Sequence, residues 1–181
     1  MNGPTLPSFR YHPLPVSTGS VALEDGACSV CCQSRGALYT GYLITDDGDD
    51  VQVCPWCIAD GTAADALDIS FTDIQPITSS GIPPEVLDEI ELRTPGFTGW
   101  QQERWMFHCD DGAAYLGTAG TEALRQHSAA IKAIEAEGRE SGWSDDDISS
   151  YINSLSRDAP PTAYLFQCLH CSTYLAYSDF T

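Results

Sequence analysis

Residues 28–57 of the chain, CSVCCQSRGALYTGYLITDDGDDVQVCPWC, begin and end with a Cys-x-x-Cys pair. Between the pairs, Ala37–Thr45 is rich in strand-forming residues, Asp46–Asp50 is an acidic turn and Val51–Val53 is apolar again, which predicts a β-hairpin. Pro55 then lies at a natural first helical position. A cysteine turn, a hairpin and a helix carrying the second pair is the order of a treble-clef zinc site. Without the helix, the same order is typical of a zinc ribbon.

The eight cysteines of the chain are spaced for metal binding. They form three Cys-x-x-Cys pairs, whereas random placement would give about a third of one pair. This spacing lets a tight turn direct two thiolates at one ion, and four soft thiolates in a tetrahedron suit Zn²⁺. The sequence therefore predicts a first zinc ion bound by Cys28, Cys31, Cys54 and Cys57. Cys32, which follows Cys31 directly, could replace it as a ligand.

A second group of metal ligands is predicted around the last cysteine pair. If two hairpins adjoin near the C-terminus, Cys109 meets Cys168 and Cys171 in a three-ligand set. His108 or His170 could complete it, but adjacent residues of a strand point to opposite faces, so only one of His108 and Cys109 easily faces inward. Three ligands and a water molecule would instead form a catalytic type of site. The thiols could also be buried without metal. We expect one zinc ion, and a second ion depends on this group.

The remaining segments predict an α+β fold in three parts. Residues 1–21 form a proline-punctuated arm, residues 22–80 the zinc lobe, and residues 81–181 an α+β region that packs with the lobe as one compact unit. In the last part we expect helices over 84–93 and 121–140 and a third capped by Ser144, with strands over 104–108 and 113–118 and on both sides of the Cys168/Cys171 turn. A treble-clef-like or ribbon-like lobe would thus pack with small antiparallel sheets and two or three helices.

The charge of the chain excludes several classes of partner. Eight Lys and Arg against 26 Asp and Glu give a formal net charge of −18, and the basic residues are scattered. Such a chain repels phosphates, so we expect no nucleic-acid binding, and a basic protein partner is favoured. No apolar run approaches the roughly 20 residues of a membrane-spanning helix, and residues 1–8 lack a secretion signal. We therefore expect a cytoplasmic chain without membrane contact, whose cysteines remain reduced.

Four segments carry a family resemblance: LPSFRYHPLP at 6–15, CPWCIADGTAA at 54–64, RTPGFTGWQQERWMFHC at 93–109 and YLFQCLHC at 164–171. Together they resemble the CbrC-like family of bacterial proteins, a group without an assigned activity. The resemblance implies that the cysteines at 28, 31, 54 and 57 are the first two pairs of that family and those at 168 and 171 its last pair. Many members carry a further cysteine shortly after the His-Cys that matches His108–Cys109. Residues 110–114 contain none here, so a second site of four cysteines is not implied.

These observations favour a zinc-stabilised protein-binding or regulatory module over an enzyme. The alternative is a zinc-dependent hydrolase that uses the second group of ligands. A thiol–disulfide redox protein is the third hypothesis. It is considered because Cys54-Pro55-Trp56-Cys57 is similar to the tetrapeptide of thioredoxin-like proteins. That motif normally accompanies a βαβ unit, whereas here it follows a cysteine pair and a hairpin. The sequence contains no Gly-rich phosphate loop, His-Glu-x-x-His or Gly-x-Ser-x-Gly.

Overall fold

A computed structural model describes residues 5–43, 51–74 and 81–179 of the 181-residue chain. The described helices are α1 (Pro55–Ala59), α2 (Thr62–Leu67), α3 (Pro84–Arg93), α4 (Thr121–Leu124), α5 (Ser128–Glu140) and α6 (Asp145–Ser154). The described strands are β1 (Val21–Ala22), β2 (Leu38–Tyr39), β3 (Phe107–His108), β4 (Asp111–Ala119), β5 (Thr162–Cys168) and β6 (Tyr174–Asp179). All strand pairs in these residues are antiparallel. The α+β class predicted from the sequence is confirmed.

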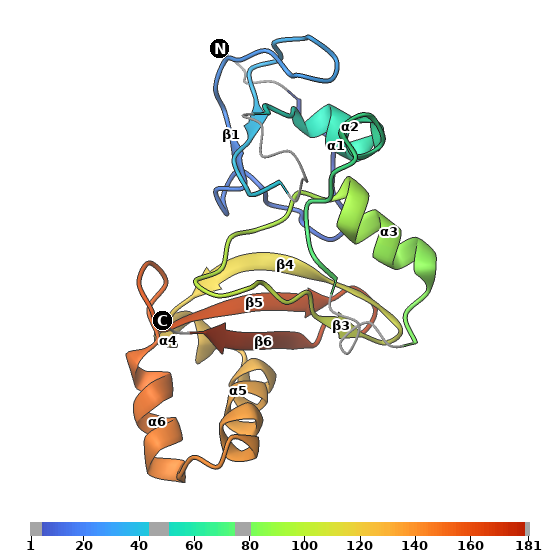
Figure 1. The fold of residues 1–181 in the computed structure, drawn as a ribbon. Coiled ribbons are helices and arrows are strands. Elements are labelled where there is room, and N and C mark those ends of the chain that lie inside the picture. Colours follow the sequence, from blue (N-terminus) through green and yellow to red (C-terminus); the bar gives the residue numbers. More distant parts are fainter. Residues whose placement is uncertain (1–4, 44–50, 75–80, 180–181) are drawn as a thin grey trace.

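A four-stranded sheet in the order β3-β4-β5-β6 lies at the centre of the molecule (Figure 1). Its inner strand β5 is buried on both faces, because successive side chains alternate between them. Tyr164 and Phe166 pack into an aromatic core with Trp105 on one face. Ala163 and Leu165 pack into the core formed with the C-terminal helices on the other. The sheet therefore separates two hydrophobic cores.

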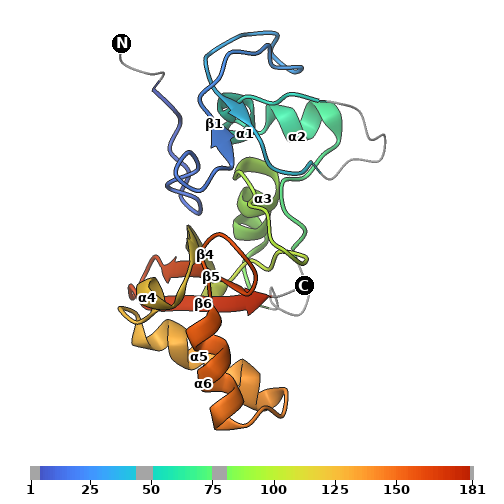
Figure 2. The same cartoon turned by 90° about the vertical axis from the view of Figure 1, so that its left-hand side faces the viewer.

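Helices α5 and α6 cover one face of the sheet, and α3 and the N-terminal residues lie beyond the opposite face (Figure 2). Helix α6 begins where the sequence predicts, because the Ser144 Oγ accepts a hydrogen bond from the Asp147 N–H at 3.2 Å. Helix α3 begins at Pro84 and buries Val86 and Ile90, also as predicted. Among the described residues, no helix is long and apolar enough to cross a membrane.

The single helix predicted over residues 121–140 is wrong, because the chain leaves the helical path after Leu124 and re-enters it at Ser128. At the break, the His127 ring stacks on Tyr174 of β6, with 3.7 Å between ring centroids. This contact anchors the start of α5 on the sheet, so that α5 buries Ile134 against the core. Helical periodicity continues across the break and therefore hides it.

The strand predicted over residues 104–108 is confined to Phe107–His108. Before β3, the Arg104 N–H donates a hydrogen bond to the Tyr177 hydroxyl at 3.0 Å, and the Trp105 Nε1–H donates to the Ala113 carbonyl oxygen at 3.0 Å. The last backbone bond of the ladder joins the Ala113 N–H to the Met106 carbonyl oxygen at 2.9 Å, and at Arg104 and Trp105 contacts through side chains replace it. The residues before β3 thus lie across one face of the sheet instead of lengthening its edge strand.

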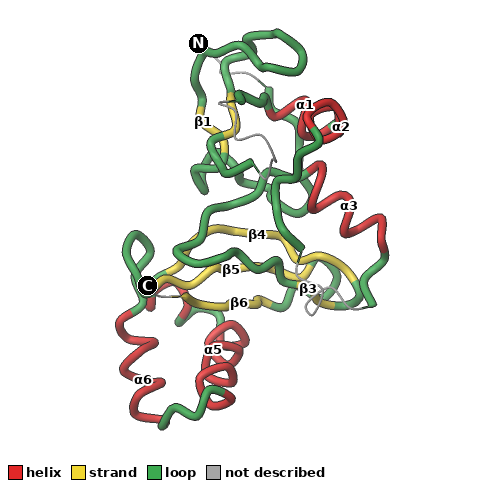
Figure 3. The backbone as a smooth tube through the Cα atoms, viewed as in Figure 1, coloured by secondary structure: helices red, strands yellow, loops and turns green. Residues whose placement is uncertain are grey.

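The N-terminal lobe, residues 21–43 and 51–74, consists mostly of loops and short helices (Figure 3). The predicted hairpin is only partly present, because Leu38–Tyr39 pairs with Val21–Ala22. On its other side, the Tyr39 N–H donates one hydrogen bond to the Val53 carbonyl oxygen at 2.8 Å. The acidic turn predicted at 46–50 lies outside the described residues.

The core of this lobe is built around its cysteines. Cys28, Cys54 and Cys57 are buried together with Ile58 and Phe71. A unit with so little regular structure and so small a core usually needs a metal or a disulfide for stability. The cysteines are placed where such a cross-link would act.

The N-terminal arm joins the lobe to the sheet. Phe9 packs into the lobe core, whereas Tyr11, two residues later, packs into the aromatic core of the sheet. The Tyr11 carbonyl oxygen also accepts a hydrogen bond from the Tyr115 N–H of β4 at 2.8 Å. The arm is thus part of the folded structure between the two units. The predicted boundaries at residues 21 and 80 stay predictions.

His12 of the arm is a buried histidine with two hydrogen-bond partners. Its Nδ1 lies 2.6 Å from the Pro95 carbonyl oxygen, which can only accept, and its Nε2 lies 2.7 Å from the Thr18 Oγ1. Burial lowers the pKa of His12 to about 4, although the hydrogen bond that the ring donates to the Pro95 carbonyl oxygen acts in the opposite direction. The ring is therefore neutral in the folded protein at neutral pH.

We predict that this histidine makes the protein less stable in mild acid. The unfolded chain takes up the proton at its ordinary pKa of about 6.5, so the free energy of unfolding falls as the pH drops from there toward the folded value. Between about pH 7 and pH 5 the loss from His12 amounts to about 2 kcal/mol. Urea unfolding at pH 7 and pH 5 measures this loss. The free energy of unfolding of His12→Gln should fall by about 2 kcal/mol less than that of the wild type. Parallel pH profiles for the two proteins would contradict the prediction.

Candidate metal centres

Four thiols of the N-terminal lobe converge on one point. One ligand atom from each of Cys28, Cys31, Cys54 and Cys57 lies within 4.8 Å of the other three. The Cys28 and Cys57 Sγ atoms are 3.8 Å apart, and so are the Cys31 and Cys54 Sγ atoms. A disulfide would need about 2.05 Å, and all four thiols are free. A zinc ion with four sulfurs at about 2.3 Å places neighbouring sulfurs about 3.8 Å apart in a tetrahedron.

The backbone around Cys28 forms a tight turn that presents the first pair. The Cys28 N–H donates to the Gln33 carbonyl oxygen at 3.0 Å, and the Cys32 N–H donates to the Cys28 carbonyl oxygen at 2.9 Å. Cys32 adopts the left-handed conformation, with φ of 55°, and its side chain is exposed. It ends the turn and lies outside the tetrad, so the alternative of Cys32 as a ligand in place of Cys31 is not seen.

The second pair is presented by the first turn of α1. Cys54 is the N-cap of this helix and Cys57 lies inside it, as Pro55 at the first helical position predicts. The Cys54 N–H donates to the Cys28 Sγ at 3.4 Å, so the two pairs are also joined through the backbone.

The electrostatics of this tetrad suit a cation. Burial opposes ionisation of Cys28, but the N–H groups of Cys31, Cys54 and Val30 outweigh it and lower its pKa to about 7. Burial raises the pKa values of Cys54 and Cys57 above the ordinary thiol value, and neighbouring thiols add to this effect. Four thiolates so close together are stable only beside a compensating positive charge. The tetrad could therefore hold a metal ion.

A second tetrad lies at one end of the sheet. One ligand atom from each of His108, Cys109, Cys168 and Cys171 lies within 4.8 Å of the other three. The Cys109 and Cys171 Sγ atoms are 3.8 Å apart, and the His108 Nδ1 lies 3.2 Å from the first and 3.4 Å from the second. Only Cys168 is buried, whereas Cys109 and Cys171 are exposed. This set could also hold a metal ion, at the surface of the protein.

A two-residue turn allows His108 and Cys109 to face the same point. His108 pairs with Asp111, which leaves Cys109 and Asp110 as the turn between β3 and β4. Both turn residues are left-handed, with φ of 54° and 57°, as in the hairpin turns that match strand twist. The second strand, which the sequence predicts from residue 113, therefore begins already at Asp111. The strand ends at His108, and the rule that neighbours point to opposite faces does not apply to Cys109.

The turn between β5 and β6 repeats the backbone pattern of the turn at Cys28. The Cys168 N–H donates to the Thr173 carbonyl oxygen at 2.8 Å, and the Ser172 N–H donates to the Cys168 carbonyl oxygen at 3.1 Å. Ser172 is left-handed, with φ of 59°, at the position equivalent to Cys32. Two segments far apart in the sequence thus form the same kind of cysteine turn.

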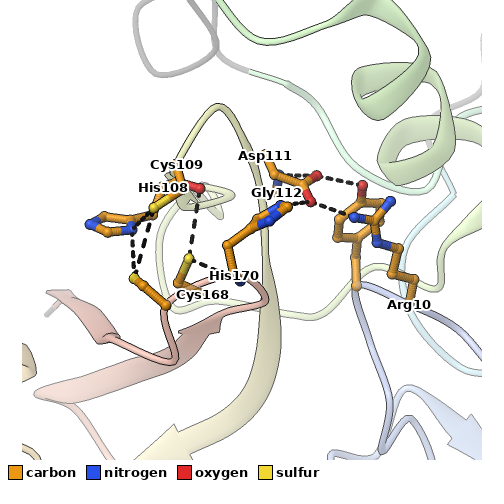
Figure 4. A network of polar contacts seen from close by, with 9 residues as sticks. Arg10, His108, Cys109, Asp111, Gly112, Cys168 and His170 are labelled. Atoms are coloured by element: carbon orange, nitrogen blue, oxygen red, sulfur yellow. Dashed lines mark hydrogen bonds and ion pairs between the residues drawn. The ribbon is translucent and has the colours of Figure 1, made fainter.

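His170 does not point to the tetrad but to Asp111 (Figure 4). The His170 Nε2 lies 2.7 Å from the Asp111 Oδ2, and the backbone N–H of His170 donates a hydrogen bond to the Cys168 Sγ at 3.4 Å. Asp111 is buried and also accepts hydrogen bonds from Arg10, from the Tyr11 hydroxyl at 2.7 Å and from the Gly112 N–H at 2.8 Å. One carboxylate thereby connects the second cysteine turn to the N-terminal arm.

The charge of Asp111 is well compensated in this network. Its burial opposes ionisation, but the hydrogen bonds from Tyr11, His170 and Gly112 and the charge of Arg10 lower its pKa below the usual value. Burial and the bond to Asp111 raise the pKa of Tyr11. Sequence reasoning missed Asp111 and Arg10, since nothing in the sequence relates positions that are a hundred residues apart.

The exposed thiols of the second tetrad differ from each other in acidity. Hydrogen bonds from the hydroxyl and the N–H of Thr173 lower the pKa of Cys171 to about 6. The neighbouring Cys171, followed by burial and Cys168, raises the pKa of Cys109 to about 11. As in the first tetrad, the first thiol to ionise hinders the next, which a bound cation would relieve.

The described residues contain both predicted ligand groups as compact sets. The structure brings together all four cysteines of the first group, and His108, Cys109, Cys168 and Cys171 of the second. Of the two histidines considered for the fourth position, His108 is the one that faces the thiols.

Comparisons with known proteins give the chain its relatives. The UPF0167 protein Mb2317 of Mycobacterium bovis and the UPF0167 protein MT2352 of Mycobacterium tuberculosis are each 45% identical over 175 residues, 97% of this chain and 94% of the relative. The UPF0167 protein PA1536 of Pseudomonas aeruginosa is 36% identical over 179 residues, 98% of this chain and 99% of the relative. No solved structure matches the chain significantly. The family model described as "Uncharacterised protein family (UPF0167)" matches residues 6–180. With nearly its whole length matched, the chain belongs to the UPF0167 family.

Proposed function

We propose that this protein is a zinc-stabilised module that binds a protein partner, with one zinc ion in each tetrad. One observation carries the metal part of the proposal: each tetrad already contains four ligand atoms within 4.8 Å of one another. A set of four protein ligands is typical of structural zinc, whereas catalytic zinc keeps one position for water. The ligands would be Cys28, Cys31, Cys54 and Cys57 in the first site, and His108, Cys109, Cys168 and Cys171 in the second.

Zinc fits these donors better than other ions. Cys₄ and Cys₃His sets are those of structural zinc sites, and a tetrahedral arrangement of thiolates excludes the hard cations Ca²⁺ and Mg²⁺. The sulfur separations of 3.8 Å in both tetrads match the edge of a zinc–sulfur tetrahedron. A treble-clef arrangement of the first lobe and kinship with CbrC-like proteins belong to the same proposal.

The two enzymatic alternatives receive less support. A zinc hydrolase at the second tetrad would need an open coordination position, whereas His108 would be the fourth ligand of an ion bound there. Thiol–disulfide exchange at Cys54 and Cys57 would need an accessible thiol of low pKa, whereas both are buried and their pKa values are raised.

A basic protein is the partner that the charge favours. The formal net charge is −18, and four arginines, Arg10, Arg104, Arg125 and Arg139, lie in ion pairs with carboxylates. The positive charge available to a phosphate is therefore smaller than the sequence alone suggests. We do not propose a nucleic acid or a membrane as the partner. We propose that the protein is located in the cytoplasm.

We predict that protein purified under reducing conditions without added metal contains two equivalents of zinc. A chelator should remove the second site's ion first, because its ligands Cys109 and Cys171 are exposed whereas the first tetrad is largely buried. Elemental analysis before and after timed exposure to a chelator measures both quantities. Less than half an equivalent of metal, with no uptake of added zinc, would contradict the proposal.

We also predict that the protein prefers basic peptides. On an array of short peptides of graded charge, at about 0.15 M salt to limit unspecific attraction, binding should rise with Lys and Arg content. Fluorescence anisotropy with DNA and RNA oligomers under the same conditions should show no saturable binding. Selection of acidic or uncharged peptides, or micromolar binding of an oligonucleotide, would disprove the partner class.

A further inference from the structure

A cleft of about 360 Å³ runs along the free edge of β6, away from both tetrads. The residues before β3 form one wall, through Gln101 and Arg104, and helices α5 and α6 form the other, through Glu137 and Tyr151. The volume lies in the range of cavities that hold small ligands or single side chains. Neither the zinc sites nor the family assignment gives this cleft a role.

The cleft contains a buried carboxylate with an unused acceptor. Asp179, at the end of β6, lines the cleft and is only 5% exposed. Its Oδ2 accepts a hydrogen bond from the Gln101 N–H at 3.0 Å. Its Oδ1 has no hydrogen-bond partner among the described residues. Such an atom costs free energy unless a donor reaches it. Because the Asp179 Oδ1 is almost fully covered in this structure, a ligand with an N–H group would reach it after the carboxylate turns toward the cleft.

The other charges of the cleft compensate each other. The Arg104 guanidinium donates to the Glu137 Oε1 at 2.8 Å and lies 4.4 Å from the centre of the Tyr177 ring. With that pair neutralised, Asp179 is the remaining charge among the lining residues. The Arg104 contacts also show that this surface accommodates a guanidinium between a carboxylate and an aromatic ring.

Aromatic side chains complete the lining. Trp143 and Tyr151 are partly buried and contact each other edge to face, with 5.0 Å between ring centroids. Both belong to the cleft. Aromatic faces beside a carboxylate attract ammonium and guanidinium groups and hold their apolar stems. The unpaired acceptor, the charge of Asp179 and the aromatic rings thus all favour a ligand with an ammonium or guanidinium group.

We propose that this cleft receives a lysine or arginine side chain of the protein partner, with its cationic group at Asp179. The proposal rests on the proposed function, since it names the part of a basic partner that this surface would recognise. It predicts that isolated cationic amino-acid derivatives bind the cleft weakly, and that a basic peptide binds through the same residues.

The test uses the zinc-loaded full chain and the probes N-acetyl-arginine amide and N-acetyl-lysine amide, with N-acetyl-glutamine amide as the uncharged control. Binding is followed by chemical-shift changes in the protein's NMR spectrum. The wild type should bind at least one cationic probe and not the uncharged one. Asp179→Asn, which retains an oxygen for the Gln101 N–H, should weaken binding about tenfold or more.

Two further variants keep the test decisive. Ser141→Trp fills the cleft from an exposed position on its rim, and should abolish binding even if Asp179→Asn does not fold. Glu140→Gln removes the same charge from an exposed neighbouring position outside the cleft, and should bind within about twofold of the wild type. Equal binding by the wild type and Ser141→Trp would overturn the cleft proposal, and so would the absence of binding to both cationic probes.

The outcomes separate this proposal from the proposed function. If basic peptides bind the wild type and Ser141→Trp equally well, the partner class stands and the cleft is wrong. If the cationic probes bind at Asp179 but the peptide array shows no preference for basic sequences, the cleft takes a free cation and the proposed partner is wrong.

Discussion

Replacing Cys57 with serine is expected to remove one zinc ion and to unfold the N-terminal lobe. Cys57 is buried in α1 and its Sγ lies 3.8 Å from that of Cys28. Serine is a poor zinc ligand, and three thiolates would remain close together without the ion that compensates them. Structural zinc contributes on the order of 10 kcal/mol in small zinc modules, which is comparable to the whole stability of a typical domain. Zinc content, far-UV circular dichroism and thermal melting measure the effect.

The adjacent cysteines provide a matched control for this experiment. Cys32→Ser changes the same atom in the same lobe, but Cys32 is exposed and lies outside the tetrad. It should retain two zinc ions and change the free energy of unfolding by no more than about 0.5 kcal/mol. A Cys57→Ser protein with two zinc ions and an unchanged melting temperature would refute the structural role. A folded, zinc-free variant that had lost thiol–disulfide exchange would support the redox alternative instead.

The first tetrad could be predicted from the sequence because its geometry is local. Each Cys-x-x-Cys pair is fixed by one turn or one helix start, as the hydrogen bonds around Cys28 and the N-cap position of Cys54 show. Helices α3 and α6 were predictable for the same reason, since Pro84 and Ser144 mark their starts. Spacing and capping rules describe short-range geometry, so the short-range features are the ones in which prediction and structure agree.

The geometry of the second tetrad could not be predicted in full, because it depends on one turn and on a sheet. Period-two alternation separates His108 from Cys109, whereas the two left-handed residues of the turn let both side chains reach the same point. The meeting of this turn with Cys168 also requires β4 to pair with β5, whose paired residues are more than forty positions apart. A sequence pattern gives no register for such a pairing.

Tertiary contacts also overrule local preference in two other places. His127 stacks on Tyr174 and ends what would otherwise be a continuous helix. Leu38–Tyr39 pairs with Val21–Ala22, a partner from the arm side of the first cysteine turn. In both places the decisive contact comes from a residue far away in the sequence.

Asp111 is the residue that depends most on such distant contacts, and its replacement is expected to have the second large effect. The variant Asp111→Asn keeps the shape of the side chain but removes its charge and places an amide donor among the donors of Arg10, Tyr11 and His170. Asp111 is 4% exposed, and asparagine keeps only one of its two acceptor oxygens, so either Arg10 and His170 or the Tyr11 hydroxyl and the Gly112 N–H lose their acceptor. We expect the free energy of unfolding to fall by about 3 kcal/mol.

The same substitution should weaken the second zinc site without touching a ligand. Asp111 holds the His170 ring, and the N–H of His170 donates to the Cys168 Sγ at 3.4 Å. Loss of a direct partner of a metal ligand lowers metal affinity by about 10–100-fold, and because Asp111 acts through His170 we expect the lower end of this range, about tenfold. Competition with a chromophoric chelator measures that affinity, and urea unfolding measures the stability. The first site should keep its ion, because its ligands come from the other lobe.

Asp110→Asn is the control that separates the role of the Asp111 network from a general effect of negative charge near the thiolates. It removes the same charge one residue earlier, at an exposed position of the turn where asparagine tolerates the left-handed conformation. Any general effect of charge near the thiolates acts on both variants alike, whereas the network through Arg10, Tyr11 and His170 involves Asp111 alone of the two. If both variants have the same stability and the same zinc affinity, Asp111 does not couple the arm to the second site. If only Asp111→Asn loses both, the arm and the site are held by one carboxylate.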